Sequence, residues 1–573
     1  MRLFRALQTL RQLARRGTAT APVEPGRRRA LLLQIDGLSS RRLKQALARG
    51  EMPHLKKWLE SGAARLRSIL AATPPSTPVF QAGLLYGEHA GVPGFGWYDR
   101  GLGRVVRMDL AEDVLAIERS IQRAATDRPL LEHGVSYGTI WPAGAAHAFF
   151  NVVLFVHGQS ASGRVVRNLY DQAVSTLAGV EILGRLASRF ALELGVAAWD
   201  FVSWCRRIRS TRFEWRFLYM RLFVSVVMRD VSTQGAIVDV LRGVPVIYLD
   251  YLGYDEYAHR RGPDSEMSLY NLRGIDAAIA KIRRATEEVP DYGYDIFVFS
   301  DHGQTATTPF ERVVGCDLHQ FVLEHAAGCV AGPIESSAIR ELVALRETEF
   351  WIRTLWPVLR PPMQLYVAWL KHRLSRRLRR RDRAPLEGIE VVTGGSIAHL
   401  YLGALPAADG GTPAKVITVD QIARRWPRLI DALARCPAVG LLVGKGRRGP
   451  VVFFRGQRYD LADRAAIETL EPCRRLGYEL LRTHLEQAVN GRRSGDLVLY
   501  GAFAEAGEIS FDFEFGSHGG LALEELDQFV MYPSEVDFPL KGAVAAEEFY
   551  RFFRARYGVF EASDEARAKK HAA

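Results

Sequence analysis

The sequence predicts an α/β fold with a mostly parallel central sheet flanked by helices. Three apolar runs are typical of strands, namely "ALLLQIDG" (30–37), "VPVIYLDYLGYDE" (244–256) and "YDIFVFSDHG" (294–303). Strands that are apolar throughout are buried on both faces, as they are in a parallel sheet. Helix-like stretches lie between the runs, at 40–62 and 268–289. This alternation favours parallel strands joined by helical crossovers.

Composition excludes some classes of protein and leaves others open. The chain has 573 residues, 48% apolar and 24% charged, which is ordinary for a large globular protein. Its formal net charge of +12 favours anionic partners, whether phosphorylated substrates, anionic lipids or nucleic acid. The five cysteines include no CxxC pair, which argues against a disulfide framework and against a thiolate zinc site.

The alternation of strands and helices is interrupted twice, at about 158–242 and about 336–385. We expect both segments to be helical insertions in a single catalytic domain that spans residues 29–560. A basic amphipathic segment (1–28) precedes this domain, and a charged tail (561–573) follows it.

Side chains that can bind a metal ion lie where the predicted strands end. Because ligands of open α/β sheets bind at the carboxyl ends of the strands, we expect these side chains to share one site. Carboxylates suit hard divalent cations, and zinc also accepts neutral imidazole. A further histidine lies in "EFGSHGGL", where glycines allow close approach of the backbone. The candidate metal ligands are Asp36, Asp255, His259, Asp301, His302 and His518.

A candidate nucleophile lies in "ATPPSTPVFQAGLLYG" (72–87), where Ser76 and Thr77 precede a helix of small residues. A hydroxyl at a helix N-terminus meets unpaired amides and a favourable dipole, which suits an anion attached to that oxygen. The alternative interpretation is that these hydroxyls only cap the helix.

Taken in order, these residues resemble the alkaline phosphatase superfamily, specifically its type I phosphodiesterase/nucleotide pyrophosphatase branch, over residues ~29–535. The pattern is an Asp after the first strand, a Ser or Thr opening a helix, D-x-x-x-H before Gly-Pro, a strand ending in D-H-G, and a late His before Gly. The resemblance implies an alkaline-phosphatase-like fold and a metal-dependent phosphodiesterase, that is, a hydrolase of phosphoric esters.

The resemblance also implies a division of the ligands between two divalent metal ions, for which zinc is expected and manganese is the alternative. One ion would be held by Asp36, Thr77, Asp301 and His302. The other would be held by Asp255, His259 and His518.

Two spacings bear on the nucleophile. The family's helix-closing glycine lies ten residues after the nucleophile, and Gly87 then indicates Thr77, whereas the proline at Pro78 indicates Ser76. We favour Thr77, which would form a phosphothreonine intermediate. The sulfatase motif requires arginine where this chain has Phe80, so sulfatase activity is not expected. The family's phosphate-binding Asn is also replaced by Phe80, and we expect the neighbouring Gln81 to bind a phosphate oxygen instead.

Three other functions stay open at this stage. The enzyme could be a phosphotransferase that moves the phosphoryl-linked group to an alcohol, or a phosphomonoesterase. A metal-stabilised binding protein without catalysis is the third, and the intact nucleophile argues against it.

By resemblance, three strand-like runs of the C-terminal half (394–403, 438–461 and 495–503) are expected to complete the central sheet and to carry His518 back to the metals. No secretory signal or transmembrane helix is recognised in the sequence, so a cytoplasmic or peripheral membrane location is expected.

A broken aromatic stretch (350–370) leads into an arginine run (371–383), a pattern typical of a segment on an anionic membrane surface. The alternative is a helical insertion packed on the core with a solvated basic end. Nucleic-acid binding by the arginine run is not expected.

Overall fold

A computed structural model describes most of the chain. The described residues are 27–89, 91–149, 151, 177–208, 214–327, 389–402, 416–504 and 507–558. Three expected features lie wholly or almost wholly outside them, namely the basic N-terminal segment, the segment at about 336–385 with its arginine run, and the charged tail.

The central sheet has eight strands in the order β20-β2-β19-β8-β1-β7-β5-β6. The predicted strand at 30–37 is β1, at the centre, and it pairs in parallel with the other two predicted strands, β7 and β8. Only β19 runs antiparallel to its neighbours. The predicted fold class is therefore confirmed. The strands are β1 (Arg29–Ile35), β2 (Ala64–Ala71), β5 (Val135–Tyr137), β6 (His147–Phe149), β7 (Val246–Tyr251), β8 (Tyr294–Phe299), β19 (Asp527–Pro533) and β20 (Ala543–Val544).

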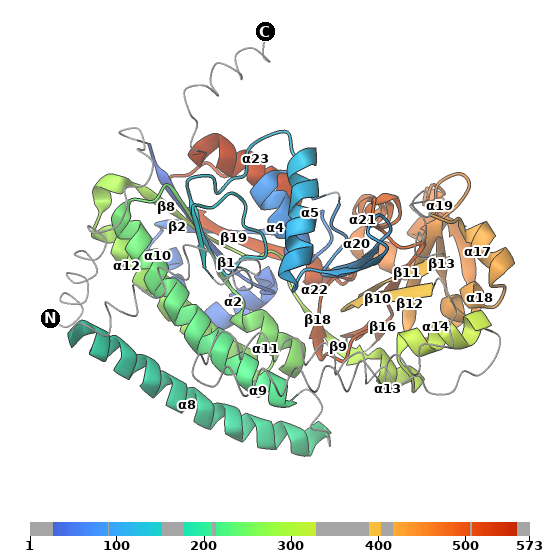
Figure 1. Cartoon of the computed structure of the whole chain (residues 1–573), viewed down its shortest axis with the longest axis horizontal. Helices are drawn as coiled ribbons and strands as arrows, with labels where there is room; N and C mark the ends of the chain where they lie inside the picture. The colour runs from blue at the N-terminus through green and yellow to red at the C-terminus, as the bar shows by residue number, and fades with distance from the viewer. Residues whose placement is uncertain are drawn as a thin grey trace, which may run out of the picture.

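Helices cover both faces of this sheet (Figure 1). Alternate residues of β1 pack to opposite sides, so that Leu31 and Leu33 join one core and Ala30 and Leu32 join the other. The first core is closed by α2 (Ser40–Arg49), α3 (Pro53–Glu60), α10 (Arg229–Arg242), α11 (Gly253–Arg261) and α12 (Glu266–Glu287). The second is closed by α4 (Thr77–Tyr86), α5 (Ala111–Ala124) and α23 (Ala546–Tyr557).

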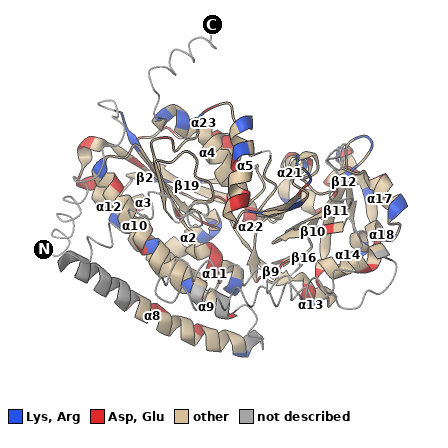
Figure 2. Cartoon of the chain, viewed as in Figure 1, with Lys and Arg blue, Asp and Glu red and all other residues tan. Residues whose placement is uncertain are grey.

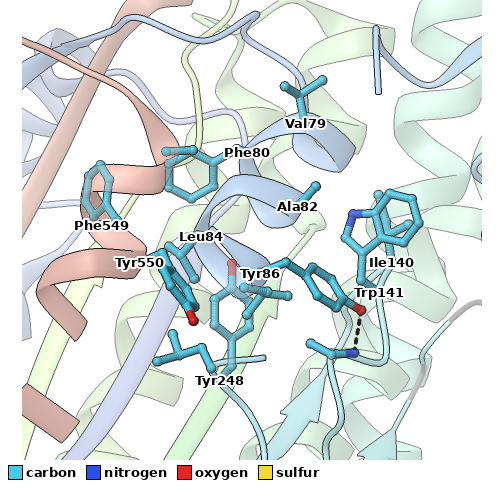
Figure 3. Close-up of a cluster of buried hydrophobic side chains, with 14 of the residues drawn as sticks. Val79, Phe80, Ala82, Leu84, Tyr86, Ile140, Trp141, Tyr248, Phe549 and Tyr550 are labelled. Atoms are coloured by element: carbon cyan, nitrogen blue, oxygen red, sulfur yellow. Dashed lines mark hydrogen bonds between the residues drawn. The ribbon is translucent and has the colours of Figure 1, made fainter. Parts of the chain in front are cut away.

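The second core positions α4, every residue of which is buried. Figure 3 shows Phe80 of α4 beside Phe549 of α23, with ring centroids 5.5 Å apart. A Cβ atom at Gly83 would lie 2.5 Å from the Cβ of Ala546, so the small residue permits α4 and α23 to approach closely. The N-terminus of α4 is thereby held at a fixed place on the sheet.

The helix-like stretch at 40–62 forms two helices instead of one. Gly50 ends α2 in the left-handed conformation, with φ of 75°, and Pro53 opens α3 at its first turn. Proline is suited to the first turn of a helix, because its missing N–H would have no partner there. The predicted helix at 268–289 is α12, which begins after the N-cap Ser265.

The described residues of the expected insertion at about 158–242 are helical. They form α8 (Leu177–Ile208), α9 (Glu214–Leu222), the π-helical turn η1 (Phe223–Met228) and α10. Figure 1 shows α8 at the periphery of the molecule, outside α9 and α11. No helix among the described residues is both long enough and apolar enough to cross a membrane.

The C-terminal strands correct one expectation, because they do not complete the central sheet. They form a separate antiparallel sheet in the order β10-β11-β15-β12-β13-β14, beside the central sheet in Figure 1. Within this sheet the pairs β10–β11, β12–β13 and β13–β14 are hairpins, and β15 lies between β11 and β12 and pairs with both. The strands are β10 (Ile389–Gly394), β11 (Ile397–Leu402), β12 (Val439–Lys445), β13 (Pro450–Phe454), β14 (Gln457–Asp460) and β15 (Leu497–Gly501).

This second sheet has a core on each face and helices of its own. One face packs against α14 (Leu318–Ala327), α17 (Val419–Arg425) and α18 (Leu429–Arg435). The opposite face packs against α19 (Arg464–Glu468), α20 (Glu471–Leu476) and α21 (Tyr478–Asn490).

A small sheet in the order β16-β17-β9-β18 joins the two parts of the molecule. Its strand β9 continues directly from the end of β8, and its strand β18 comes from the C-terminal half. The strands are β9 (Thr305–Pro309), β16 (Phe503–Ala504), β17 (Gly507–Ser510) and β18 (Gly516–Ser517). The short helices α13 (Phe310–Val314) and α22 (Leu523–Leu526) and the hairpin of β3 (Gly96–Asp99) with β4 (Arg104–Arg107) complete the elements near the sheets.

Candidate active site

Five of the candidate ligands meet at the carboxyl edge of the central sheet. Asp36 directly follows β1, and Asp301 with His302 follows β8. Asp255 and His259 lie on α11, which begins just after β7. Because β1 is hydrogen-bonded in parallel to both β7 and β8, the three strands end at the same edge. The parallel order alone therefore brings together residues from three distant parts of the chain.

The sixth ligand reaches this edge through the small sheet. Ser517 of β18 pairs with Thr305 of β9, only three residues after His302. The next residue, His518, is thereby placed against His302, and the two imidazole rings stack with centroids 3.9 Å apart. His259 lies on the other side of His518, with ring centroids 5.1 Å apart.

The hydroxyl of Thr77 lies among these side chains. Its Oγ1 atom is 3.2 Å from Nε2 of His302 and 3.4 Å from Oδ1 of Asp36, and the residue is buried. Thr77 is the first residue of α4, and Ser76 is the N-cap residue, which makes no capping hydrogen bond through its side chain. The positive end of the α4 dipole therefore points at the Thr77 hydroxyl.

His259, His302 and His518 share one hydrogen-bonding pattern. In each, Nδ1 lies against a backbone carbonyl oxygen, that of Gly303 for His302 at 3.0 Å, Gly516 for His259 at 2.9 Å, and Pro75 for His518 at 2.9 Å. A carbonyl oxygen only accepts hydrogen bonds, so Nδ1 carries the hydrogen and Nε2 of each neutral ring keeps its lone pair. This is the tautomer that coordinates a metal ion through Nε2.

The protonation of the buried groups fits a cation site. Burial, with a further contribution from His518, holds the pKa of His302 well below its usual value, and burial also lowers the pKa of His518. Burial, followed by the charges of Asp301 and Asp255, raises the pKa of Asp36 well above its usual value. Burial and Asp255 raise the pKa of Asp301 to about 7. Neutral imidazoles are already in the ligand form, and a bound cation would relieve the crowding of the carboxylates.

The ligand atoms fall into two groups, and the atoms within each group all lie within 4.8 Å of one another. One group is Asp36, Asp301 and His302, and the other is Asp255, His302 and His518. The first corresponds to the protein ligands expected for one metal ion, with Thr77 beside it. In the second, His302 lies where His259 was expected, while Nε2 of His259 is 3.1 Å from Oδ2 of Asp255. Oδ2 of Asp301 is buried without a hydrogen-bond partner in the described part of the chain, which leaves it available to a cation.

Two further residues support the ligands and were not singled out in the sequence. Glu514 lies 3.1 Å from Nδ1 of His259, and together with Asp255 it outweighs the effect of burial and raises the pKa of that imidazole. The amide of Gln304 donates a hydrogen bond to the carboxylate of Asp255. Gln304 directly follows the D-H-G motif, and Glu514 lies four residues before His518, so their closeness to these motifs in the sequence is a signal that points to both.

Gln81 lies on α4, and its side chain is fully buried. Its Nε2 atom donates a hydrogen bond to Oδ2 of Asp250 at 2.9 Å, and its Oε1 atom accepts one from the backbone N–H of Ile140 at 2.9 Å. These bonds tie α4 to β7 and to the loop after β5. The expected contact of Gln81 with a phosphate oxygen stays a prediction.

Comparison with known proteins identifies what this arrangement is similar to. The sequence model of the type I phosphodiesterase / nucleotide pyrophosphatase family matches residues 30–327, which is more than half of the chain. No curated protein matches the chain significantly. The matched segment contains every candidate ligand except His518.

Two solved structures illustrate the structural similarity. Phosphonoacetate hydrolase from Sinorhizobium meliloti 1021, in complex with phosphonoformate, is 15% identical, and the match covers 93% of this chain and 96% of that chain with a TM-score of 0.42. An inactive variant of murine ectonucleotide pyrophosphatase / phosphodiesterase 5, in complex with AMP, is 10% identical over 93% and 96% of the two chains, also with a TM-score of 0.42.

Proposed function

We propose a specific activity for this chain, which belongs to the type I phosphodiesterase / nucleotide pyrophosphatase family and is accordingly a hydrolase of phosphoric esters. The proposed activity is that of a phosphodiesterase with Thr77 as its nucleophile and two divalent metal ions. The observation that carries this proposal is the position of the Thr77 hydroxyl, 3.2 Å from Nε2 of His302 and 3.4 Å from Oδ1 of Asp36 at the N-terminus of α4. A buried hydroxyl in such surroundings is suited to nucleophilic attack rather than to helix capping.

The residues fit two metal ions, of which zinc is the proposed identity and manganese the alternative. Asp36, Asp301 and His302 would hold one ion next to Thr77, and Asp255, His259 and His518 would hold the other. When bound, two such ions lower the pKa of the attacking hydroxyl and neutralise charge on the transferring group. Asp36, Asp255 and Asp301 offset the charge of the ions.

The reaction that we propose proceeds by two displacements at phosphorus. The Thr77 oxygen attacks the phosphodiester in line, a bond forms between Oγ1 and phosphorus, and the bond to one ester oxygen breaks. The proton that the Thr77 hydroxyl loses is balanced by the proton that the departing oxygen takes up, so that an alcohol leaves. Water then attacks the phosphothreonine ester, the bond between Oγ1 and phosphorus breaks, and a proton from the water restores the Thr77 hydroxyl as a phosphate monoester is released. The N-terminus of α4 favours the negative charge carried by the group attached to Thr77.

A phosphotransferase is the second candidate, and it differs only in the acceptor. An alcohol in place of water would take the phosphoryl-linked group from Thr77, with the same first step. Product analysis with and without an added alcohol distinguishes the two reactions, because a transferase yields a new diester and a hydrolase yields a monoester.

A panel of aryl substrates tests the proposed activity. Protein reconstituted with zinc or with manganese is assayed with a bis-aryl phosphodiester, an aryl phosphomonoester and an aryl sulfate. We expect the highest kcat/KM for the diester. Faster turnover of the monoester would favour the phosphomonoesterase alternative, and the absence of turnover on all three with metals bound would favour a binding protein.

We also propose that the protein associates peripherally with anionic membranes. The support is the net charge of +12 and the sequence of residues 350–383, which combines tryptophans with a dense run of arginines. Clustered Lys and Arg residues near an anionic surface contribute roughly 1 kcal/mol each to binding. A phospholipid or another lipid-linked phosphodiester is the corresponding substrate class.

A further inference from the structure

Two acidic side chains of α8 face inward. Glu193 and Asp200 are buried although both are charged. Oε1 of Glu193 accepts a hydrogen bond from Nε of Arg221 at 2.7 Å, and Oδ2 of Asp200 accepts one from Nη2 of Arg261 at 2.8 Å. These ion pairs fix which side of α8 faces the rest of the protein.

The outward side of α8 carries large apolar side chains. Leu192 is 71% exposed and Trp199 is 65% exposed, and Val202 is exposed on the same side. Leu194 and Phe190 are exposed as well, about half a turn of the helix away from Leu192. More than half of the large apolar side chains that are exposed in the described part of the chain lie on this one helix. A helix at the surface of a protein normally has the opposite arrangement, with its apolar side buried. An exposed apolar surface of this extent indicates a binding partner.

Charge identifies the kind of partner. Between Ser188 and Arg206 the only charged residues are Arg189 and the two buried acids, and in Figure 2 the described part of α8 is largely free of charge. Further arginines lie on either side of this stretch in the sequence, namely Arg185 before it and Arg206, Arg207 and Arg209 at its end and after it. An apolar helix face with an exposed tryptophan and basic ends is typical of a helix that lies in the interface of an anionic membrane.

A second copy of the chain fits this surface less well. A two-fold contact brings the same surface of each copy together, so the basic ends of one α8 would face the basic ends of the other. Like charges at such a contact oppose association, whereas the head groups of anionic lipids complement them.

We propose that the outward face of α8, centred on Leu192, Trp199 and Val202, docks on an anionic lipid surface. This inference deepens the peripheral association proposed above by locating it on the described part of the chain. It also relates the membrane to the catalytic site. Trp204 of α8 contacts Phe515, three residues before His518, with ring centroids 5.2 Å apart. Arg261, the partner of Asp200, is the last residue of α11, which carries Asp255 and His259.

Lipid vesicles test the proposal with the full-length protein. Binding is measured by co-sedimentation with vesicles of phosphatidylcholine alone and of phosphatidylcholine mixed with phosphatidylserine. The test variant combines Leu192→Glu with Trp199→Glu, two changes at exposed positions. We expect its apparent Kd for the anionic vesicles to rise about 10-fold or more, because two apolar anchors are replaced by charges. The matched control is Leu102→Glu, at a side chain 48% exposed in the β3–β4 turn, which should bind as the wild type does.

A second measurement does not depend on a charged substitution. Vesicles that contain brominated phosphatidylcholine quench the fluorescence of a tryptophan that enters the membrane, and we expect Trp199→Phe to be quenched less than the wild type, with the remaining quenching due to other tryptophans. Equal vesicle binding by the wild type and the double variant would overturn the α8 surface and leave peripheral association to another segment. The absence of wild-type binding would overturn both.

Self-association is the remaining outcome. A dimer in sedimentation equilibrium that dissociates in the double variant would assign the face to a second copy and overturn the proposal. Hydrolysis of a soluble bis-aryl phosphodiester reports on the catalytic site alone, and we expect it to be the same in the wild type, the double variant and Leu102→Glu. The hydrolysis assay and the vesicle assay thus distinguish an incorrect assignment of the activity from an incorrect assignment of the membrane-binding surface.

Discussion

The imidazole rings of His302 and His518 stack face to face, with centroids 3.9 Å apart, although the two residues are more than 200 positions apart in the sequence. His302 lies between β8 and β9, and His518 follows β18, which pairs with β9. Each ring donates from Nδ1 to a backbone carbonyl, so both Nε2 atoms remain available to ligands. The C-terminal half of the chain therefore contributes directly to the site whose other ligands lie in the segment that matches the family.

The first prediction concerns metal content. We expect purified, zinc-reconstituted protein to bind close to two equivalents of metal, and chelation to abolish activity. His518→Ala or Asp255→Ala should lower the content to about one equivalent, because each removes a ligand of the same proposed ion. Elemental analysis after gel filtration measures this.

The control for metal content is His54→Ala, which removes a half-buried histidine of α3 that is not among the proposed ligands and should keep both equivalents. Two retained equivalents in both His518→Ala and Asp255→Ala would contradict the proposed ligands. Loss of both ions in either variant would indicate that the two sites bind cooperatively.

The second prediction separates the two neighbouring hydroxyls. Thr77→Ala should lower kcat by about three orders of magnitude or more while the metal content is retained, because the attacking oxygen is lost. Ser76→Ala should change kcat by no more than a few-fold, since the Ser76 side chain makes no capping hydrogen bond. Steady-state kinetics with a bis-aryl phosphodiester measures both. The reverse pattern would assign the nucleophile to Ser76, as the spacing to Pro78 suggests.

Much of this site was predictable from the sequence because its determinants are local. The strands β1, β7 and β8 are continuous apolar runs, and the residues at their ends include Asp36, Asp301 and His302, so the pattern of the sequence indicates both the sheet and the site. The position of His518, in contrast, is not determined locally. It depends on the pairing of two residues of β18 with β9, and such a short contact between distant segments has no local signal.

The same reasoning explains the two features that the sequence did not predict. The strands β11, β12 and β15 are largely buried on both faces, as the strands of the central sheet are, and that pattern does not specify which sheet a strand joins. In α8 the acidic residues Glu193 and Asp200 would be placed toward solvent by amphipathicity. They are buried because Arg221 and Arg261 come from other helices, which only the tertiary structure brings together.

The third prediction concerns the pH dependence of stability. Glu508 and Glu525 are buried beside Gly520, whose N–H donates to Oε2 of Glu525 at 2.6 Å. Burial and the charge of Glu525 raise the pKa of Glu508 well above its usual value, and burial raises the pKa of Glu525 to about 7. Because these folded-state pKa values lie above those of the unfolded chain, the carboxyls stabilise the fold fully only below about pH 4.5, and this contribution is lost as the pH rises through about 7.

We therefore expect Glu525→Gln to lessen the decrease in the free energy of unfolding between about pH 5 and pH 8, because the amide does not ionise. Urea titrations in the presence of a chelator measure this, since the chelator keeps the metal ligands in the same state in each protein. Glu486→Gln, at an exposed residue of α21, is the control and should follow the wild type. Parallel pH profiles for Glu525→Gln and the wild type would contradict the prediction.

The fourth prediction concerns the ion pair that joins α8 to the metal-binding helix. Arg261 donates to Asp200 and to Glu214 at 2.8 Å each, all three side chains are buried, and the guanidinium lies over the ring of Trp204 at 4.6 Å. Removing one partner of a buried ion pair costs about 3–5 kcal/mol when the other charge is left without compensation. Because Glu214 still pairs with Arg261, we expect Asp200→Ala to lower the free energy of unfolding by less than this amount. Asp431→Ala breaks the exposed pair with Arg435 and should lower the free energy of unfolding much less, because water screens that pair. Because Arg261 ends α11, Asp200→Ala should also weaken binding of the metal ion held by Asp255 and His259, and a competition titration with a zinc chelator measures this. A variant as stable as Asp431→Ala, with unchanged zinc affinity, would mean that α8 packs on the protein without supporting the catalytic site.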